Sequence, residues 1–272
     1  MNRSHSLRWA ITAVGLILVS ACMFVHAQDK GEYQPHSGQP GKDVVWVPTP
    51  QDLVDRMLEM AKVTPQDYVI DLGSGDGRTV ITAAKLGAQA MGIEYNPDMV
   101  ELSKRNAAEA GVASKASFVK ADLFESDFSK ATVITMFLLP DINLRLRPRL
   151  LTLKPGTRVV SNTFTMEDWE ADGTVNLEHG CISWCTAYLW IIPAKAEGKW
   201  RLSNGSLELT QTFQMINGKL NIAGQTSTVR GRLTGYNISF QADSTEYEGK
   251  VEGDVITVSA KSGGKIRATR EK

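Results

Sequence analysis

Between residues 44 and 192, short apolar runs alternate with segments whose apolar residues recur at helical spacing. The runs are typical of strands buried in a sheet and predict strands over residues 68–72, 89–94, 117–119, 132–139 and 158–164. The helical spacing predicts helices over residues 78–86, 97–110 and 144–153. This alternation predicts the α/β fold class, with a doubly wound and mostly parallel sheet. A last run at residues 186–192 would close the sheet as a final edge or antiparallel strand.

Another helix is expected just before the first strand. The apolar residues that recur there at helical spacing are Leu53, Met57, Leu58 and Ala61. Thr49 is a good N-cap for this helix, with Pro50 at the first helical position. Thr49 would equally suit a residue that closes over a bound ligand, and the pattern leaves both roles open.

The pattern changes after Pro193, and no helix is expected from Gly198 onward. Apolar and polar residues alternate there, which predicts short strands near residues 220–222, 228–233, 237–241, 247–251, 255–259 and 265–269. Asn217-Gly218 is a strong hairpin-turn signal. Evenly spaced short strands predict a small antiparallel, all-β C-terminal domain, either a barrel or a sandwich.

The first residues are typical of an export signal. Arg3 and Arg8 supply positive charge, residues 9–25 are almost entirely apolar, and Val-His-Ala at residues 25–27 suits a signal peptidase. The expected organisation is therefore a signal peptide (1–27), a polar linker (28–43), an α/β domain (44–195) and a β-domain (196–272).

Two alternatives to cleavage before Gln28 remain. Residues 19–22 resemble a lipobox, which would make Cys22 a lipidated N-terminus, and an uncleaved segment would act as an anchor. We expect the protein to contact a membrane only through such a lipid anchor or uncleaved segment. Each of them, like simple cleavage, places the protein in the periplasm or cell envelope.

Charge and cysteine content restrict the classes of partner and of metal site that we expect. The 30 basic and 30 acidic residues give a net charge of zero, which offers no field for nucleic acid, so no nucleic-acid partner is expected. Cys181 and Cys185 have only His179 nearby, so no metal site is expected. A strand beginning at Trp184 would hold the two thiols apart, so two separate thiols are favoured over a disulfide.

The first candidate ligand-binding motif lies in the turn after the first predicted strand. Residues 69–77 read Val-Ile-Asp-Leu-Gly-Ser-Gly-Asp-Gly, and a glycine-rich turn between strand and helix lets a ligand approach the backbone. A dinucleotide fingerprint would place its third glycine at Arg78, whereas here it falls at Gly77. Asp71 precedes the turn, where it would repel a pyrophosphate but attract an ammonium.

Two more acids follow the next two predicted strands. Glu94 closes the second strand, where a carboxylate can accept both hydroxyls of a ribose. Asp122 follows the third strand. Each acid alone would be read as an ordinary surface residue. Together, three acids at three successive strand ends on one edge of the sheet are improbable by coincidence.

The Asp-Leu-Gly-x-Gly-x-Gly order resembles motif I of the class I S-adenosylmethionine-dependent methyltransferases, which have a Rossmann-like sheet. The resemblance implies S-adenosylmethionine as methyl donor. It also implies that Asp71 and the loop amides hold the methionine end and that Asp122 meets the adenine amine. The full set of expected cofactor contacts is Asp71, Gly73, Ser74, Gly75, Asp76, Gly77, Glu94, Tyr95, Asp122, Leu123 and Thr49.

Two further motifs resemble one branch of that family. Residues 47–50 (Val-Pro-Thr-Pro) and 136–140 (Met-Phe-Leu-Leu-Pro) look like those of mitochondrial protein-lysine methyltransferases acting on ATP synthase c-subunit and adenine nucleotide translocase. The similarity covers residues 44–169 and not the β-domain. It implies a protein lysine or another amine as acceptor.

No dedicated catalytic base stands out, in keeping with methyl transfer, which chiefly requires alignment in a dry site. Asp141 and Asn143 are weak candidates to line the substrate mouth, and capping of the following helix is an equal alternative for both. Trp169, Trp184 and Trp190 are expected in the core rather than in an aromatic cage.

Two other functions remain open. The protein could bind S-adenosyl compounds or another nucleoside without turnover, with the β-domain as an interaction module. It could instead methylate a small molecule.

Overall fold

The computed structural model describes residues 33–179 and 181–271. The predicted signal peptide, including Cys22, lies outside the described residues. None of the helices in the two described stretches is long and apolar enough to cross a membrane.

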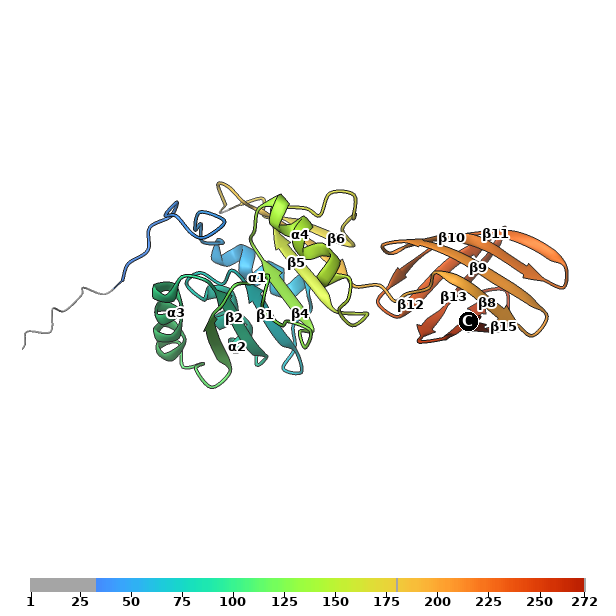
Figure 1. Ribbon diagram of the computed structural model, residues 1–272, viewed down its shortest axis with the longest axis horizontal. Coiled ribbons are helices and arrows are strands. Elements are labelled where there is room, and N and C mark those ends of the chain that lie inside the picture. The colour runs from blue at the N-terminus through green and yellow to red at the C-terminus, as the bar shows by residue number, and fades with distance from the viewer. Residues whose placement is uncertain (1–32, 180, 272) are drawn as a thin grey trace, which may run out of the picture. The chain divides into compact units, whose positions relative to one another are not determined.

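Seven strands form one sheet in the order β3-β2-β1-β4-β5-β7-β6 (Figure 1). Their bounds are β1 (Tyr68–Leu72), β2 (Gln89–Glu94), β3 (Ala116–Lys120), β4 (Val133–Met136), β5 (Arg158–Asn162), β6 (Gly173–Asn176) and β7 (Thr186–Ile191). Strands β1 to β5 pair in parallel, whereas β7 is antiparallel to both of its neighbours. The predicted α/β fold class and mostly parallel sheet are confirmed.

The far end of the sheet differs from the prediction. The run at residues 186–192 does form an antiparallel strand, but it lies inside the sheet between β5 and β6 rather than at the edge. The edge strand β6 was not predicted. It has four residues, Gly-Thr-Val-Asn, that are half-buried or exposed, so it carries too little apolar pattern to stand out.

Four helices cover the sheet: α1 (Gln51–Met60), α2 (Arg78–Lys85), α3 (Pro97–Glu109) and α4 (Pro140–Leu150). Alternate residues of β1 face opposite sides, as the period of two requires. Val69 joins a core cluster with residues of α1, α2 and α3, and Ile70 joins another with residues of α4. The sheet is therefore buried on both faces, which explains its continuous apolar runs.

Two helix starts differ from those predicted. Pro50, not Thr49, is the N-cap of α1, and no side chain caps this helix. Helix α4 begins at Pro140, four residues before the predicted start, with Leu139 as N-cap and again no side-chain cap. Neither Thr49 nor Asp141 is therefore an N-cap.

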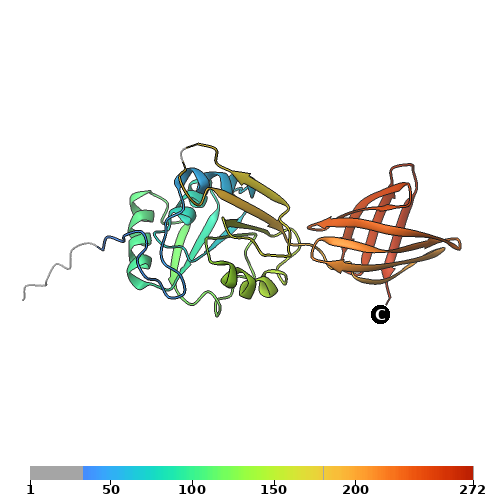
Figure 2. The same ribbon diagram turned by 90° about the horizontal axis from the view of Figure 1, so that it is seen from above.

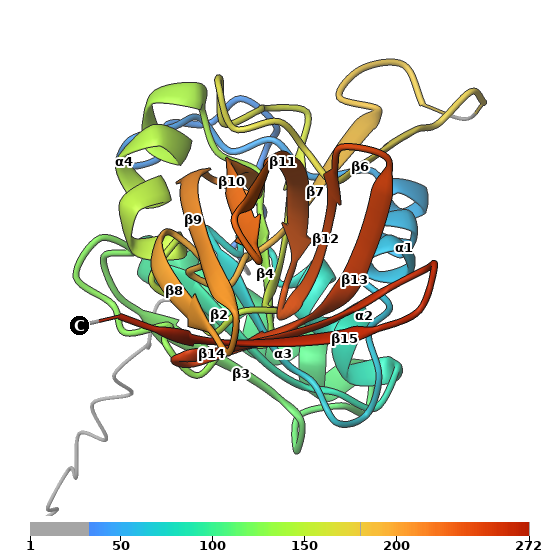
Figure 3. The ribbon, with the colours of Figure 1, turned by 90° about the vertical axis from the view of Figure 1, so that its right-hand side faces the viewer.

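The C-terminal strands close into an antiparallel barrel (Figures 2 and 3). Its strands are β8 (Gly198–Leu202), β9 (Gly205–Thr212), β10 (Met215–Ile222), β11 (Gln225–Thr234), β12 (Asn237–Ala242), β13 (Thr245–Glu252), β14 (Val255–Ala260) and β15 (Lys265–Arg270). Buried apolar residues such as Trp200, Leu209 and Ile256 form its core. Of the two predicted architectures, a barrel or a sandwich, the C-terminal domain therefore forms the barrel.

The hairpin predicted at Asn217-Gly218 is wrong. Both residues lie inside β10, and the turn is made by Phe213 and Gln214, with Phe213 at a φ of 52°. A Cβ at Gly218 would come 1.9 Å from the Glu208 carbonyl oxygen. The glycine therefore serves a close approach of two strands rather than a turn.

Candidate active site

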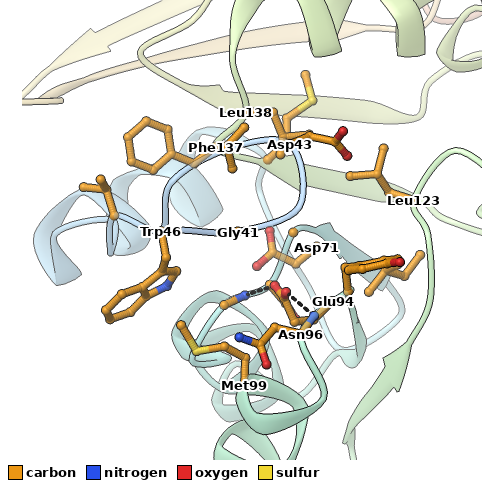
Figure 4. A pocket seen from close by; sticks show the side chains of 18 of the residues that line it. Gly41, Asp43, Trp46, Asp71, Glu94, Asn96, Met99, Leu123, Phe137 and Leu138 are labelled. Carbon is orange, nitrogen blue, oxygen red and sulfur yellow. Dashed lines mark hydrogen bonds between the residues drawn. The ribbon is translucent and has the colours of Figure 1, made fainter. Parts of the chain in front are cut away.

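A cavity of about 530 Å³ lies at the carboxyl edge of the parallel strands (Figure 4). Residues that follow β1, β2, β3 and β4 line it, and β1 and β4 are the pair at which the strand order reverses. Open α/β sheets bind their ligands at such a switch point. The volume falls in the range of small-molecule sites.

The turn after β1 brings the backbone to the cavity. Gly73 and Gly75 have φ values of 80° and 53°, which favour glycine. A Cβ at Gly73 would come 3.1 Å from a Leu138 methyl group, and one at Gly75 would come 2.5 Å from the Trp46 indole nitrogen. Side chains at these two positions would narrow the cavity.

Gly77, which the sequence also predicts as a cofactor contact, does not line the cavity. It is the N-cap of α2 with a φ of 82°. A Cβ there would come 2.8 Å from the Phe118 ring and 2.9 Å from the Ser103 Cβ. Its lack of a side chain allows α2 to pack against β3 and α3.

Asp71 lies buried in the cavity wall. The Thr135 hydroxyl donates a 2.7 Å hydrogen bond to its Oδ1. Burial raises the pKa of Asp71 to about 7, the bond from Thr135 opposes that rise, and the negative charges of Glu94 and Asp76 add to it. A cationic group bound beside Asp71 would favour its ionised form.

Glu94 holds the turn and the start of α3 together. Its Oε2 accepts a 2.9 Å hydrogen bond from the Gly75 amide, and its Oε1 accepts one of 2.9 Å from the Asn96 amide (Figure 4). A carboxylate has about four acceptor sites. Glu94 therefore keeps acceptor capacity for the hydroxyls of a ribose.

Asp122 carries an ion pair with Lys42, whose ammonium also lies 4.8 Å from the centre of the Tyr95 ring. The Lys42 bond lowers the pKa of Asp122, helped by a bond from the Phe124 amide, and raises the pKa of Lys42. Asp122, Tyr95 and the neighbouring Leu123 all line the cavity.

Asp76 and Thr49 are linked through one arginine. Arg78 pairs with Asp76 at 2.6 Å and donates a 2.9 Å bond to the Thr49 carbonyl. The Thr49 hydroxyl accepts a 3.2 Å bond from the Asn162 amide. Both Asp76 and Thr49 line the cavity, as does Ser74.

A segment that precedes α1 covers the cavity. The sequence predicts a linker over residues 28–43, but Gln39 to Trp46 folds back on itself: Gly38 donates to the Trp46 carbonyl at 2.8 Å, and Trp46 donates to the Gln39 carbonyl at 2.9 Å. Residues 40–48 line the cavity. The polar composition concealed this role. The apolar run from Val44 to Val47 is the signal for it, and Val44 packs against the core cluster that contains α4.

The two weak catalytic candidates do not line the cavity. Asp141 is exposed in the first turn of α4. Asn143 is buried and donates to the Phe164 and Thr165 carbonyls, both at 3.3 Å. Its position supports the segment after β5.

The three tryptophans have different environments. Trp169 and Trp190 are core residues, as the sequence predicts. Trp184 is not, because its side chain is 41% exposed and lines the cavity.

Cys181 and Cys185 form a disulfide, with their Cα atoms 5.8 Å apart. The favoured prediction of two separate thiols is therefore wrong. The strand begins at Thr186 rather than Trp184, and Trp184 has a φ of 62°, so the chain bends between the cysteines. Within the described part of the chain, no group of three or more His, Cys, Asp or Glu side chains is placed to hold a metal ion.

The donor set fits S-adenosylmethionine. Asp71 suits its ammonium, Glu94 its ribose hydroxyls and Asp122 its adenine amine, while Met99, Leu123 and Leu138 offer apolar surface. When bound, S-adenosylmethionine supplies an electrophilic methyl group on a sulfonium. All of the cofactor contacts predicted from the sequence except Gly77 line this one cavity.

Comparison with known proteins gives the same class. The family described as ANTKMT methyltransferase domain matches residues 71–173, and a family described as DNA methylase matches residues 28–105. The protein-lysine N-methyltransferase of Saccharolobus islandicus (strain REY15A) is 45% identical over 163 residues, which are 59% of this chain and 96% of that protein.

Two further relatives agree. The lysine N-methyltransferase of the ATP synthase c-subunit from Mus musculus is 35% identical over 130 residues, which are 47% of this chain and 52% of that protein. A crystal structure of an RNA methyltransferase from Salinibacter ruber in complex with S-adenosyl-L-homocysteine is 52% identical, has a TM-score of 0.52, and is aligned over 55% of this chain and 95% of that one.

The strand order, the three acids around one cavity and a relative matched over nearly its whole length lead to one conclusion. The chain belongs to the class I S-adenosylmethionine-dependent methyltransferases, in the family that contains the protein-lysine methyltransferase of Saccharolobus islandicus, and it uses S-adenosylmethionine as methyl donor.

Proposed function

We propose that this methyltransferase transfers the methyl group to the side-chain amine of a protein lysine. The observation that carries the proposal is the 45% identity to a protein-lysine N-methyltransferase along 96% of that protein's length. The mouse relative is likewise named as a lysine methyltransferase.

The chain's own residues suit an amine acceptor. Beside the three acids, the cavity is lined by apolar groups that include Leu139, Ile142 and Phe164. An apolar wall excludes water and lowers the pKa of an amine, which favours the neutral form that attacks a methyl group. No proton-accepting side chain is needed beyond this, since positioning supplies most of the rate.

The test is transfer of a labelled methyl group. The full chain is incubated with labelled S-adenosylmethionine and an envelope extract, and labelled protein is hydrolysed and analysed by mass spectrometry. We expect N-methyl-lysine, and we expect its yield to fall sharply with the Glu94→Ala variant. Label at another residue type would contradict the lysine assignment.

The same experiment separates the other acceptor classes. The Salinibacter ruber relative is described as an RNA methyltransferase, so a ribonuclease-treated sample is run in parallel. Label that disappears with ribonuclease, or that remains with small molecules, would contradict a protein acceptor. Tight cofactor binding with no label anywhere would favour a binding protein without turnover.

We further propose that the protein is exported to the periplasm or cell envelope, with cleavage before Gln28. The disulfide between Cys181 and Cys185 supports this, because disulfides persist in oxidising compartments. Mass spectrometry of the mature N-terminus tests it. An N-terminus at Gln28 is expected, whereas an intact Met1 or an acylated Cys22 would contradict this form of processing.

A further inference from the structure

We propose that Phe137, Phe164 and Trp184 form an aromatic wall that binds the methylated ammonium of the acceptor, and that the Cys181–Cys185 disulfide holds Trp184 in that wall. The inference rests on the proposed amine acceptor. It identifies the residues that recognise this acceptor, and it predicts that binding of the acceptor is sensitive to reduction of the disulfide.

The three rings come from three loops at one edge of the sheet. Phe137 directly follows β4, and Phe164 lies two residues after β5. Trp184 lies two residues before β7, which is antiparallel to β5, so its start meets the end of β5. The Thr163 amide donates a 2.7 Å bond to the Thr186 carbonyl and ties the two loops together.

The rings contact one another. The distances between ring centres are 6.1 Å for Phe137 and Phe164, 6.0 Å for Phe137 and Trp184, and 5.6 Å for Phe164 and Trp184. These are ordinary distances for aromatic pairs, so the cluster leaves no space for a cation between its rings. A ligand would lie across the surface that the rings present to the cavity.

This surface belongs to the same cavity as the cofactor carboxylates. Phe137, Phe164 and Trp184 line it together with Asp71 and Glu94. Phe137 and Phe164 are half-buried, and Trp184 is 41% exposed, so aromatic surface remains accessible. The wall is thus within reach of an acceptor placed for methyl transfer.

The disulfide constrains the conformation of Trp184. It closes the loop from Cys181 to Cys185, and the Cys185 carbonyl accepts a 2.9 Å bond from the Leu177 amide across the hairpin. Trp184 has a φ of 62°, which a bulky side chain rarely adopts. Such a conformation persists only where its surroundings hold it, and the covalent closure supplies that constraint.

Aromatic faces suit the product of amine methylation. A methylated ammonium carries positive charge on a surface of methyl groups, and it is attracted to the faces of Trp and Phe rings. The methylene chain of a lysine side chain also packs favourably on such rings. The wall would therefore prefer a methylated ammonium to a neutral group of the same shape.

The test uses choline, a quaternary ammonium, and 3,3-dimethyl-1-butanol, its neutral isostere. Binding of each to the full chain saturated with S-adenosylhomocysteine is measured by calorimetry or NMR. We expect choline to bind about 10-fold more tightly than the alcohol. Equal binding of the two compounds, or no binding of choline, would overturn the proposal.

Substitutions at Trp184 test whether this side chain binds choline. Trp184→Ala should weaken choline binding about 10-fold, and Trp184→Phe should retain most of it. Ile182→Ser is the matched control, because Ile182 is fully exposed in the same loop and does not line the cavity. Unchanged affinity for S-adenosylhomocysteine shows that each variant is folded, and unchanged choline binding by Trp184→Ala would contradict the assignment.

The disulfide is tested separately. Reduction, or the double substitution Cys181→Ser with Cys185→Ser, should weaken choline binding and leave the affinity for S-adenosylhomocysteine unchanged. Reductant should have no further effect on the double variant. Full choline binding after reduction would refute the role of the disulfide.

The wall and the proposed lysine acceptor can fail independently. Choline binding requires no methyl transfer, so choline binding without methylation of lysine would support the aromatic wall and contradict the lysine acceptor. Methylation of lysine without a difference in affinity between choline and its isostere would support the lysine acceptor and contradict the aromatic wall.

Discussion

Asp71 and Thr135 lie opposite each other on the neighbouring strands β1 and β4, and the Thr135 hydroxyl donates a 2.7 Å hydrogen bond to the Asp71 carboxylate. Both residues are buried. The bond stabilises the ionised carboxylate, but the cost of burial is larger, and the pKa of Asp71 rises to about 7. The charge of this group therefore changes near neutral pH.

Cofactor affinity should fall as the pH decreases below about 7. The folded pKa of Asp71 lies above its ordinary value, so the protonated form predominates in the free protein below that pH. The cationic ligand binds the ionised form, and affinity then falls by up to about tenfold per pH unit. Calorimetry with S-adenosylmethionine between about pH 5 and pH 7 checks this.

Two variants control that experiment. Asp71→Asn cannot titrate and should bind weakly with little pH dependence over the same range. Thr135→Val removes the donor, so it should raise the pKa of Asp71 and move the loss of affinity to higher pH. An identical pH profile for wild type and Asp71→Asn would show that another group is responsible.

Glu94→Ala should weaken cofactor binding about 100-fold. It removes the acceptor that we expect to bind the ribose hydroxyls through charge-assisted hydrogen bonds worth on the order of 3 kcal/mol, and it frees the Gly75 amide, which donates to Glu94. Calorimetry with S-adenosylhomocysteine measures the change, and Glu101→Ala, on the exposed side of α3, is the control. Unchanged affinity would refute the ribose assignment.

Gly77→Ala should destabilise the fold more than Gly111→Ala does. Both glycines have positive φ values, 82° and 70°, so each substitution carries a similar backbone cost of about 1 kcal/mol. A Cβ at Gly77 also meets Phe118 and Ser103, whereas one at Gly111 meets nothing within 4 Å. Urea unfolding compares the two, and equal losses would contradict the packing role of Gly77.

Asn143→Ala should lower stability, by about 1–3 kcal/mol, because it removes the donor to the Phe164 and Thr165 carbonyls. Asp141→Ala, at an exposed position in the same helix, should change stability by less than about 1 kcal/mol. Thermal unfolding measures both. Full stability of Asn143→Ala, combined with a loss of turnover, would instead favour the catalytic role.

The strand and helix positions were predictable because burial leaves a periodic signal in consecutive residues. Strand β4 is apolar except for Thr135, and α3 begins at Pro97 as expected. Strand β6 was missed because its four residues are short of apolar side chains. The hairpin turn predicted at Asn217-Gly218 is wrong because Gly218 is required for the close approach of β9. The local sequence carries no signal of that contact.

The sequence by itself determined which acidic residues meet at the cavity. Asp71, Glu94 and Asp122 each end or follow a strand, and the carboxyl ends of parallel strands meet at one edge of a sheet. Chain order and strand direction are enough to bring them together.

Only the tertiary structure decided what surrounds them. Trp46 lies against the turn from the segment that precedes α1, Lys42 pairs with Asp122, and Trp184 reaches the cavity through a bent, disulfide-closed loop. These positions depend on contacts between residues far apart in the chain. Loop conformation is set by such contacts and not by periodicity, so local sequence carries little information about it.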